Sequence, residues 1–165
     1  MFKQIFLPLI VVATFITLVG LLGQGKLNYF FNLPSPTPKV SLKTVKIENL
    51  EIDVEVAKSA DERAKGLSGR DRLDENSGMV FVFSKDSKPI FWMKDTKIAL
   101  DIIWINYNKI VGIEKNVQPE IGKSDSELEK YVSPSTIDYV LEVNAGFSDK
   151  NNIRSGQMIS GLEQL

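Results

Sequence analysis

Hydrophobic and acidic residues alternate strictly over residues 50–56, a pattern typical of a strand with one buried face. The even-numbered positions are leucine, isoleucine and valine, and the odd-numbered positions are aspartate or glutamate. Residues 44–47 also alternate between polar and apolar positions. The pattern therefore predicts two consecutive half-buried strands at the start of a folded domain.

Further short segments are rich in β-branched and aromatic residues, which favours additional strands. These segments are residues 79–83, 89–93, 99–106, 109–114, 137–143 and 157–159. Asn106, Tyr107 and Asn108 lie between two of them and predict a hairpin turn. The total is about eight short strands.

Helical signals are few. Ser59 and Glu62 have the spacing of a capping box, so a short helix should begin there and stop at Gly66. Residues 147–152 predict a helical turn. Together these elements predict a mainly β fold, α+β by strict count, with one or two short helices. The sheet should be compact, barrel-like and mostly antiparallel.

An apolar helix is predicted ahead of this domain. Residues 5–22 contain no charge, and as a helix at about 1.5 Å per residue they would be roughly 27 Å long, enough to span a bilayer. Lys3 resembles the charged start of a secretory signal, and residues 23–25 form a weak cleavage site. The run exceeds the usual length of a cleaved signal, so we favour an uncleaved anchor over a cleaved signal or a buried core helix.

The first two interpretations both export everything after residue 26. The domain is then membrane-anchored outside the cytoplasm, in the periplasm or at the cell surface, or secreted if the signal is cleaved. Proline at every second position from residue 34 to residue 38 favours a semi-rigid linker. The expected organisation is a membrane segment over 1–26, a linker over 27–39 and one globular β-rich domain over 40–165.

Composition narrows the range of functions. The chain is 43% hydrophobic and 25% charged, as expected of a globular protein with one core. Its 20 basic and 21 acidic residues are well mixed, which argues against nucleic-acid binding. The absence of cysteine and histidine excludes disulfides, thiolate nucleophiles, zinc–sulfur sites, His-ligated metals and Ser-His-Asp triads.

Two motif-like stretches do not support a cofactor. Residues 20–26 have the glycine and lysine spacing of a phosphate-binding loop, but Leu27 replaces the Ser or Thr that would hold magnesium. Residues 71–78 are rich in side chains with oxygen atoms, but these side chains do not occupy the alternating positions that supply the ligands in a calcium-binding loop. We therefore expect no nucleotide, metal or other cofactor.

Five ordered sequence blocks carry a family resemblance. They are ADERAKGLSGR (60–70), GMVFVF (78–83), FWMKDT (91–96), LDIIWI (100–105) and YVLEVNAG (139–146). With this order and spacing, the chain resembles the domain of unknown function 192 family over roughly residues 43–162. The resemblance implies a small, mostly β domain behind an export or anchor segment, and no reaction, cofactor or catalytic residue is established for the family.

The block FWMKDT joins aromatic residues directly to charged ones. Phe91 and Met93 should share one strand face and Trp92 the other, with Lys94 and Asp95 leaving the strand at its end. We interpret the block as a strand that ends at a functional site.

Two carboxylates lie within otherwise apolar strands. Asp101 belongs to a strand that is apolar on both faces and hence covered on both sides, and Glu142 shares a face with Val140. A shielded carboxylate needs a cation or several N–H donors, and the candidate cations are Arg63, Arg70 and Lys94. We hypothesise that one pocket of mixed charge is lined by Arg63, Arg70, Trp92, Lys94, Asp95, Asp101, Glu142 and Asn144.

A structural alternative stays open, in which these residues are ion pairs that tie strand ends together. The long polar connection over residues 118–135 is interpreted as a solvated surface without chemistry, or else as a flap over a site.

Three functions are compatible with the sequence. The favoured one is a small binding module of the cell envelope with a carbohydrate-like ligand, because Trp92 beside Asp95 and Asn144 would suit a sugar. The second is a hydrolase that uses the carboxylates Asp101 and Glu142. The third is an envelope assembly or accessory factor that acts by protein contact.

Overall fold

A computed structural model of the protein describes residues 42–165. The predicted membrane segment and linker lie outside the described residues. Seven strands form one sheet in the order β6-β5-β8-β3-β2-β1-β9, and a separate pair joins β4 to β7. The strands are β1 (Lys43–Ile47), β2 (Leu50–Ala57), β3 (Ser77–Ser87), β4 (Ile90–Phe91), β5 (Leu100–Asn106), β6 (Lys109–Val117), β7 (Tyr131–Val132), β8 (Ile137–Asn144) and β9 (Ile159–Ser160).

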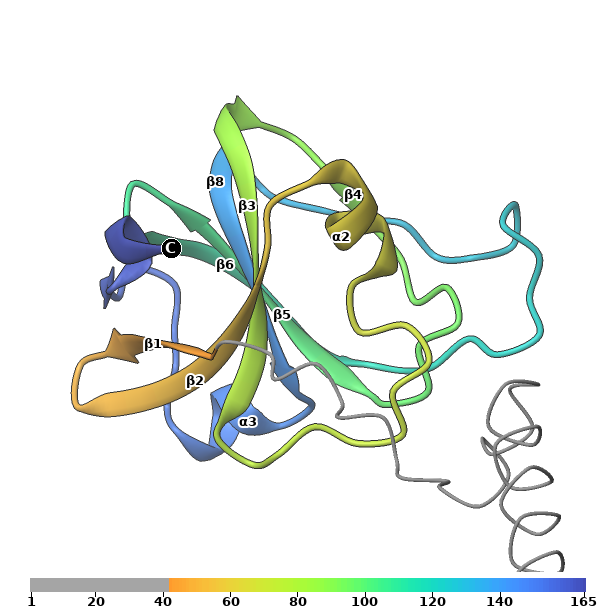
Figure 1. The fold of residues 1–165 in the computed structure, drawn as a ribbon, viewed down its shortest axis with the longest axis horizontal. Coiled ribbons are helices and arrows are strands. Elements are labelled where there is room, and N and C mark those ends of the chain that lie inside the picture. Colours follow the sequence, from red (N-terminus) through yellow and green to blue (C-terminus); the bar gives the residue numbers. More distant parts are fainter. Residues whose placement is uncertain (1–41) are drawn as a thin grey trace, which may run out of the picture. The chain divides into compact units, whose positions relative to one another are not determined.

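The large sheet curls into a half-barrel (Figure 1). All its strand pairs are antiparallel except β2 with β3, which run parallel. A parallel pair needs a crossover, and here residues 58–76 supply it. One isolated bridge, Lys109 to Met158, brings the β6 edge to the segment beside β9. The predicted mainly β, barrel-like sheet is thus confirmed in outline, with curling in place of full closure.

In the part of the chain that the structure describes, three helical segments accompany the sheet: α2 (Ala60–Lys65), α3 (Phe147–Lys150) and the 3-10 helix η2 (Leu162–Gln164). The Ser59 side chain accepts from the Glu62 N–H, the Glu62 carboxylate accepts from the Ser59 N–H, and Gly66 caps the C-terminal end. The predicted helix and its capping box are therefore confirmed. Within residues 42–165 no helix is long and apolar enough to cross a membrane.

Each face of the sheet has its own hydrophobic core. One core joins Val80, Ile103 and Leu141 to the C-terminal segment, and the other joins Phe81, Ile102 and Trp104 to Leu67 and Phe91. We call the second one the pocket-side core. In Figure 1, α2, β4 and the loop of residues 118–135 lie on one side of strands β3 and β8, and the C-terminal end lies on the other. Strand β5 is buried along both faces, as its sequence predicts.

Local turns shape the segments beside the sheet. Tyr107 and Asn108 both have positive φ, which gives the two-residue turn of the predicted β5–β6 hairpin. The strand predicted over residues 89–93 is only two residues long. It ends early because Asp95 has φ 53° and the Thr96 N–H donates to the Met93 carbonyl at 3.1 Å, which turns the chain away.

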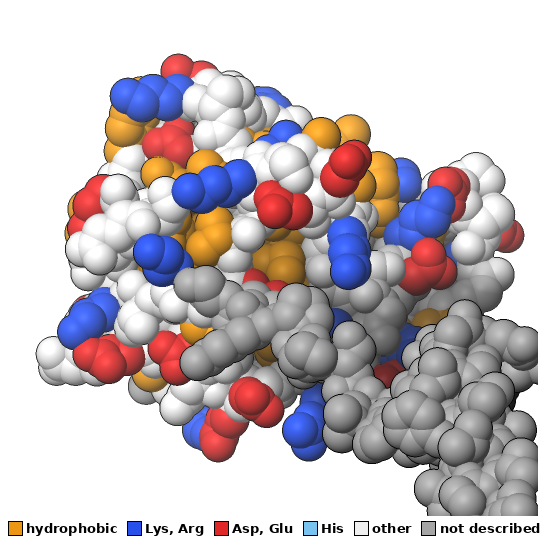
Figure 2. Space-filling model, viewed as in Figure 1, with side chains coloured by type: hydrophobic (Ala, Val, Ile, Leu, Met, Phe, Trp, Pro, Cys, Tyr) orange, Lys and Arg blue, Asp and Glu red, His pale blue; other side chains and the backbone are white. Residues whose placement is uncertain are grey.

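Basic and acidic side chains are interspersed over the surface. Figure 2 shows Lys and Arg next to Asp and Glu across the visible face, with hydrophobic side chains between them. Among the described residues seven ion pairs form, and in most of them both partners are largely exposed. Such pairs contribute little to stability.

Candidate functional site

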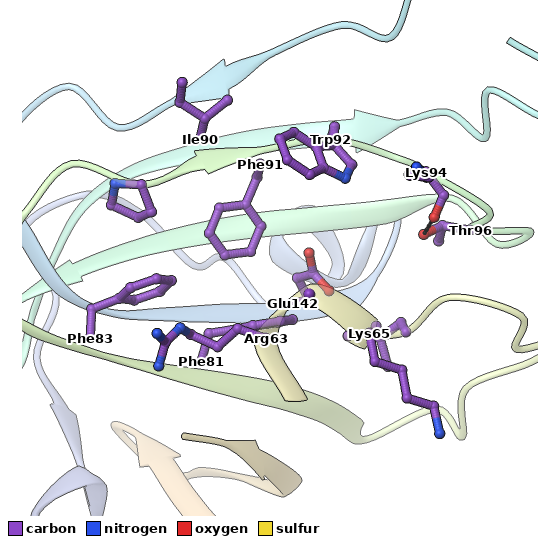
Figure 3. A pocket seen from close by; sticks show the side chains of 14 residues that line it. Arg63, Lys65, Phe81, Phe83, Ile90, Phe91, Trp92, Lys94, Thr96 and Glu142 are labelled. Carbon is purple, nitrogen blue, oxygen red and sulfur yellow. Dashed lines mark hydrogen bonds between the residues drawn. The ribbon is translucent and has the colours of Figure 1, made fainter. Parts of the chain in front are cut away.

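A pocket of about 210 Å³ lies between α2, the strands β3 and β8, and the segment around β4 (Figure 3). Its walls come from sequence segments far apart in the chain. The lining residues are Arg63, Ala64, Lys65, Gly66, Leu67, Phe81, Phe83, Pro89, Ile90, Phe91, Trp92, Lys94, Thr96 and Glu142.

Glu142 is the only carboxylate among these lining residues. Its neighbours across the strands are Met79 on β3 and Ile102 on β5, so an apolar floor surrounds it. The side chain is 6% exposed, and no other described residue forms a hydrogen bond or ion pair with its carboxyl group. Burial raises the pKa of Glu142 to about 8. At neutral pH most of the Glu142 carboxyl groups therefore carry a proton.

Aromatic rings form one wall of the pocket. The Phe91 ring meets Phe81, Phe83 and Trp104 edge to face, with centroid distances of 5.1, 6.0 and 5.4 Å. Such contacts fix the ring orientations. In Figure 3 Phe91 lies between Phe83 and Glu142. Sequence reasoning did not select Phe81 or Phe83 as site residues, although their spacing of two in GMVFVF places them on one face.

Three cations line the pocket, and only one of them forms an ion pair within residues 42–165. Lys94 Nζ lies 2.7 Å from Asp125. Arg63 donates to the carbonyl oxygens of Lys58 and Val82 and lies over the Phe83 ring. Lys65 has no acidic partner among the described residues, so positive charge is in excess around the mouth of the pocket.

The long connection over residues 118–135 supplies no residue to the pocket lining, but it contacts two residues that line the pocket. It supplies Asp125 to Lys94, and its Lys130 ammonium lies 4.3 Å from the centre of the Trp92 ring. Its strand β7 pairs with β4. No local sequence pattern indicates these contacts, because β7 is only two residues long and its partner strand lies about 40 residues earlier.

Four of the eight residues in the hypothesised pocket line this one: Arg63, Trp92, Lys94 and Glu142. Arg70 instead pairs with Glu55. The Asn144 amide donates to the carbonyls of Leu73 and Asp74, which ties the crossover to β8. Asp95 lies exposed in the turn after Met93. The sequence-based hypothesis thus combined residues that the tertiary structure separates.

Asp101 is the fourth residue that lies elsewhere, on the opposite face of the sheet from Glu142. It is fully buried. Its carboxylate oxygens accept hydrogen bonds from the backbone N–H groups of Asn116, Gly146 and Ser148, with N···O distances of 2.9, 3.1 and 2.8 Å. The register sets Ile102, not Asp101, opposite Glu142. The idea that Asp101 and Glu142 act as a catalytic pair is therefore wrong, since their side chains point away from each other.

The expected partners of the two shielded carboxylates also need correction. The Asp101 carboxylate accepts hydrogen bonds from N–H donors, which was one of the two alternatives, but Glu142 has neither such donors nor a cation among the described residues. None of Arg63, Arg70 and Lys94 pairs with either carboxylate. Protonation resolves the buried charge of Glu142 instead.

Replacement of Lys94 by methionine is therefore expected to leave the stability of the domain close to that of the wild type. The hydrogen bond that Lys94 donates to Asp125 raises the pKa of Lys94, but both side chains are largely solvent-exposed, where ion pairs add little. Urea unfolding followed by tryptophan fluorescence measures this, because both tryptophans lie in the described domain. A marked loss of stability would show that Lys94 has a structural role that its exposure does not suggest.

No cluster of three or more His, Cys, Asp or Glu side chains suited to a metal ion occurs within residues 42–165. The chemistry that the pocket offers is thus hydrogen bonding by Glu142, apolar contact with the phenyl rings and charge attraction at the rim.

Comparison with known proteins gives a family and two similar crystal structures. The family model DUF192, described as uncharacterized ACR, matches residues 43–161. A candidate transcription regulator from Sinorhizobium meliloti 1021 has a TM-score of 0.67 and 26% identity, covering 76% of this chain and 97% of that chain. A protein of unknown function from Novosphingobium aromaticivorans DSM 12444 has the same TM-score and 25% identity, covering 76% of this chain and 89% of that chain.

No curated protein matches the chain. The family match spans well over half of the sequence and contains all five blocks that carry the resemblance. It therefore confirms that resemblance, and the chain belongs to the DUF192 family.

Proposed function

We propose that the protein is an extracytoplasmic binding module, exported by or anchored through residues 5–22, that takes a small organic ligand into the pocket around Glu142. The observation that carries this proposal is the Glu142 carboxyl group, which is 6% exposed, faces an open pocket and has no partner within residues 42–165. A pocket with apolar walls and one polar group is typical of small-ligand sites.

The energetics of the fold support a ligand at this position. A buried polar group without a hydrogen-bond partner costs roughly 1–3 kcal/mol, so such groups are uncommon in folded proteins. Leucine in place of Glu142 would match its apolar neighbours on the adjacent strands, Met79 and Ile102. A ligand that forms a hydrogen bond with Glu142 would supply the partner that residues 42–165 do not provide.

The geometry favours a ligand less polar than a sugar. The carbohydrate surface expected from the sequence required Trp92 beside Asp95 and Asn144, and neither Asp95 nor Asn144 lines the pocket. The ring of Trp92 also has Lys130 above it. We therefore favour compact amphipathic molecules as the ligand class. Sugars are included among the compounds of the binding test.

A protein-contact function is the second candidate. Ile90, Trp92 and Val132 are exposed by 53%, 44% and 48%, and Ile90 and Val132 are direct partners in the β4–β7 pair. Exposed apolar side chains grouped in this way are typical of interaction surfaces. One similar structure is described as a candidate transcription regulator. The net charge of this chain does not support such a role, since its 20 basic and 21 acidic residues produce no basic surface field that would attract DNA.

Titration of the full chain in lipid nanodiscs with a panel of small water-soluble carboxylates, amides, amines and sugars tests the binding proposal. We expect at least one class to change the fluorescence of Trp92, which lines the pocket, and to raise the melting temperature. Ala64→Phe is the control: Ala64 is exposed on α2 and lines the pocket, so the added ring should block entry. If no class has an effect, or if Ala64→Phe binds unchanged, the proposed site is wrong.

A further inference from the structure

We infer that the pocket selects small organic carboxylates with an apolar body, whose carboxylate accepts a hydrogen bond from the Glu142 carboxyl group. This inference rests on the proposed function of the pocket as a ligand site. It adds the chemical class of the ligand and the group that recognises it.

The pocket has an apolar end and a polar end. Figure 3 shows Phe83 and Ile90 at one end, Phe91 and Glu142 in the middle, and Lys94 with Thr96 at the other end. A molecule that enters with its long axis along the pocket meets phenyl rings with one half, where Arg63 lies over Phe83, and polar groups with the other half. An amphipathic ligand fits this division, whereas a uniformly polar ligand would be desolvated against the rings without compensation.

The charges of the lining favour an anion. Arg63, Lys65 and Lys94 contribute three positive charges, and the Asp125 partner of Lys94 is 73% exposed and lies outside the lining. Within residues 42–165, neither Arg63 nor Lys65 has a carboxylate partner. Because buried side chains such as Phe81 and Phe91 line the pocket, the attraction between these cations and a bound anion is screened less than at a flat surface.

A cationic ligand is disfavoured by the same geometry. An ammonium group would seek the faces of the aromatic rings. The Arg63 guanidinium already lies 5.0 Å from the centre of the Phe83 ring, and the Lys130 ammonium lies 4.3 Å from that of Trp92. An incoming cation would displace these contacts and would meet the positive charge of the rim.

Glu142 is suited to donate to a carboxylate. Burial raises its pKa to about 8, so its carboxyl group carries the proton that a ligand carboxylate can accept. Hydrogen bonds of the O–H···O⁻ type are among the strongest in proteins. The charged groups that face the pocket come from α2 (Arg63 and Lys65) and from the segment after β4 (Lys94), whereas β3 and β5 contribute only uncharged side chains around Glu142.

Three matched probes of similar shape test the inference: phenylacetate, phenylacetamide and phenethylamine. Calorimetric titration of the full chain in nanodiscs should show that phenylacetate binds at least about tenfold more tightly than the amide at neutral pH, and that the amine does not bind. The affinity for phenylacetate should fall about tenfold between pH 6.5 and pH 9, because Glu142 loses its proton over this range.

Variants separate the role of Glu142 from general electrostatics. Glu142→Gln keeps an N–H donor without titration, so it should retain phenylacetate binding within severalfold and lose the pH dependence. Glu142→Leu should bind phenylacetate at least about tenfold more weakly. Lys65→Met should lower the affinity for phenylacetate more than the affinity for phenylacetamide. Lys115→Met, whose lysine pairs with Asp149 away from the pocket, should have no effect.

The results of these titrations show whether the ligand class alone is wrong or whether the proposed function of the pocket is wrong as well. Tighter binding of the amide or the amine than of phenylacetate would overturn the carboxylate class and leave the pocket as a ligand site. Binding of phenylacetate with an unchanged pH dependence in Glu142→Gln would overturn the role of Glu142. If neither the probes nor any member of the wider panel binds, the inference and the proposed function both fail.

Discussion

Glu142→Gln is expected to stabilise the domain at alkaline pH and to remove most of the pH dependence of its stability above pH 5. Burial raises the pKa of Glu142 to about 8 from an ordinary value of 4.5. One pKa unit corresponds to about 1.4 kcal/mol, so the gain of the variant over the wild type should grow by on the order of 3–5 kcal/mol between pH 5 and pH 9. Urea unfolding followed by tryptophan fluorescence measures the difference.

The stability of the wild type falls with rising pH because the folded protein holds the Glu142 proton more tightly than the unfolded chain does. Between pH 4.5 and pH 8 the folded wild type keeps the Glu142 proton and the unfolded chain has lost it. The folded state is therefore favoured below pH 4.5, and that advantage is lost as the pH rises through 8. Carboxylates with lowered pKa values, such as Glu51 and Glu62, act in the opposite sense, because the stability that they contribute is lost as the pH falls.

Glu75→Gln provides the matched control. The hydrogen bond from Lys150 lowers the pKa of Glu75, and this carboxylate lies on the surface. The difference in stability between this control and the wild type should stay constant from pH 5 to pH 9, and it should shrink only at more acidic pH, where Glu75 becomes protonated. If the profiles of Glu142→Gln and the wild type stay parallel over that range, Glu142 is ionised in the folded protein, and its role as a proton donor in the pocket is excluded.

Asp101→Ala is expected to destabilise the domain by about 3–5 kcal/mol, because the substitution empties a fully buried site and leaves three backbone N–H groups without their acceptor, one in a buried and two in part-buried hydrogen bonds. These groups belong to Asn116 at the end of β6 and to Gly146 and Ser148 around the start of α3. The Asp101 carboxylate on β5 thus holds the end of β6 and the start of α3 together. The free energy of urea unfolding measures the loss.

Two further variants test this explanation. Asp101→Asn keeps one acceptor oxygen and turns an N–H₂ group toward the remaining N–H donors. Its free energy of unfolding should therefore lie between that of the wild type and that of the alanine variant. Asp53→Ala removes an exposed aspartate whose side chain accepts from Thr44, and it should change stability little. A loss for Asp101→Ala no larger than that for Asp53→Ala would mean that water or a local shift satisfies the three amides.

Local patterns accounted for most of the secondary structure. The capping box of Ser59 and Glu62 predicted α2, and the alternation over residues 50–56 predicted β2, because both signals depend on neighbours within a few residues. The two-residue strand β7 escaped prediction, since it is defined by its pairing with β4 and not by its own sequence.

The candidate site was predicted only in part. Trp92, Lys94 and Glu142 were selected because each conflicts with its local pattern, and all three line the pocket. Asp101 conflicts with its pattern in the same way but has a structural role on the other face. A pattern shows that a polar side chain is buried, but it does not show which partner it meets.

Short-range periodicity and ordered motifs were enough to predict the family, the mainly β composition, the helix α2 and the two-sided burial of β5. They did not show that Glu142 faces an open pocket and has no partner within residues 42–165, or that three backbone N–H groups satisfy Asp101. These features depend on the strand register, which assigns each side chain to a face and is set by pairing between residues about 40 positions apart.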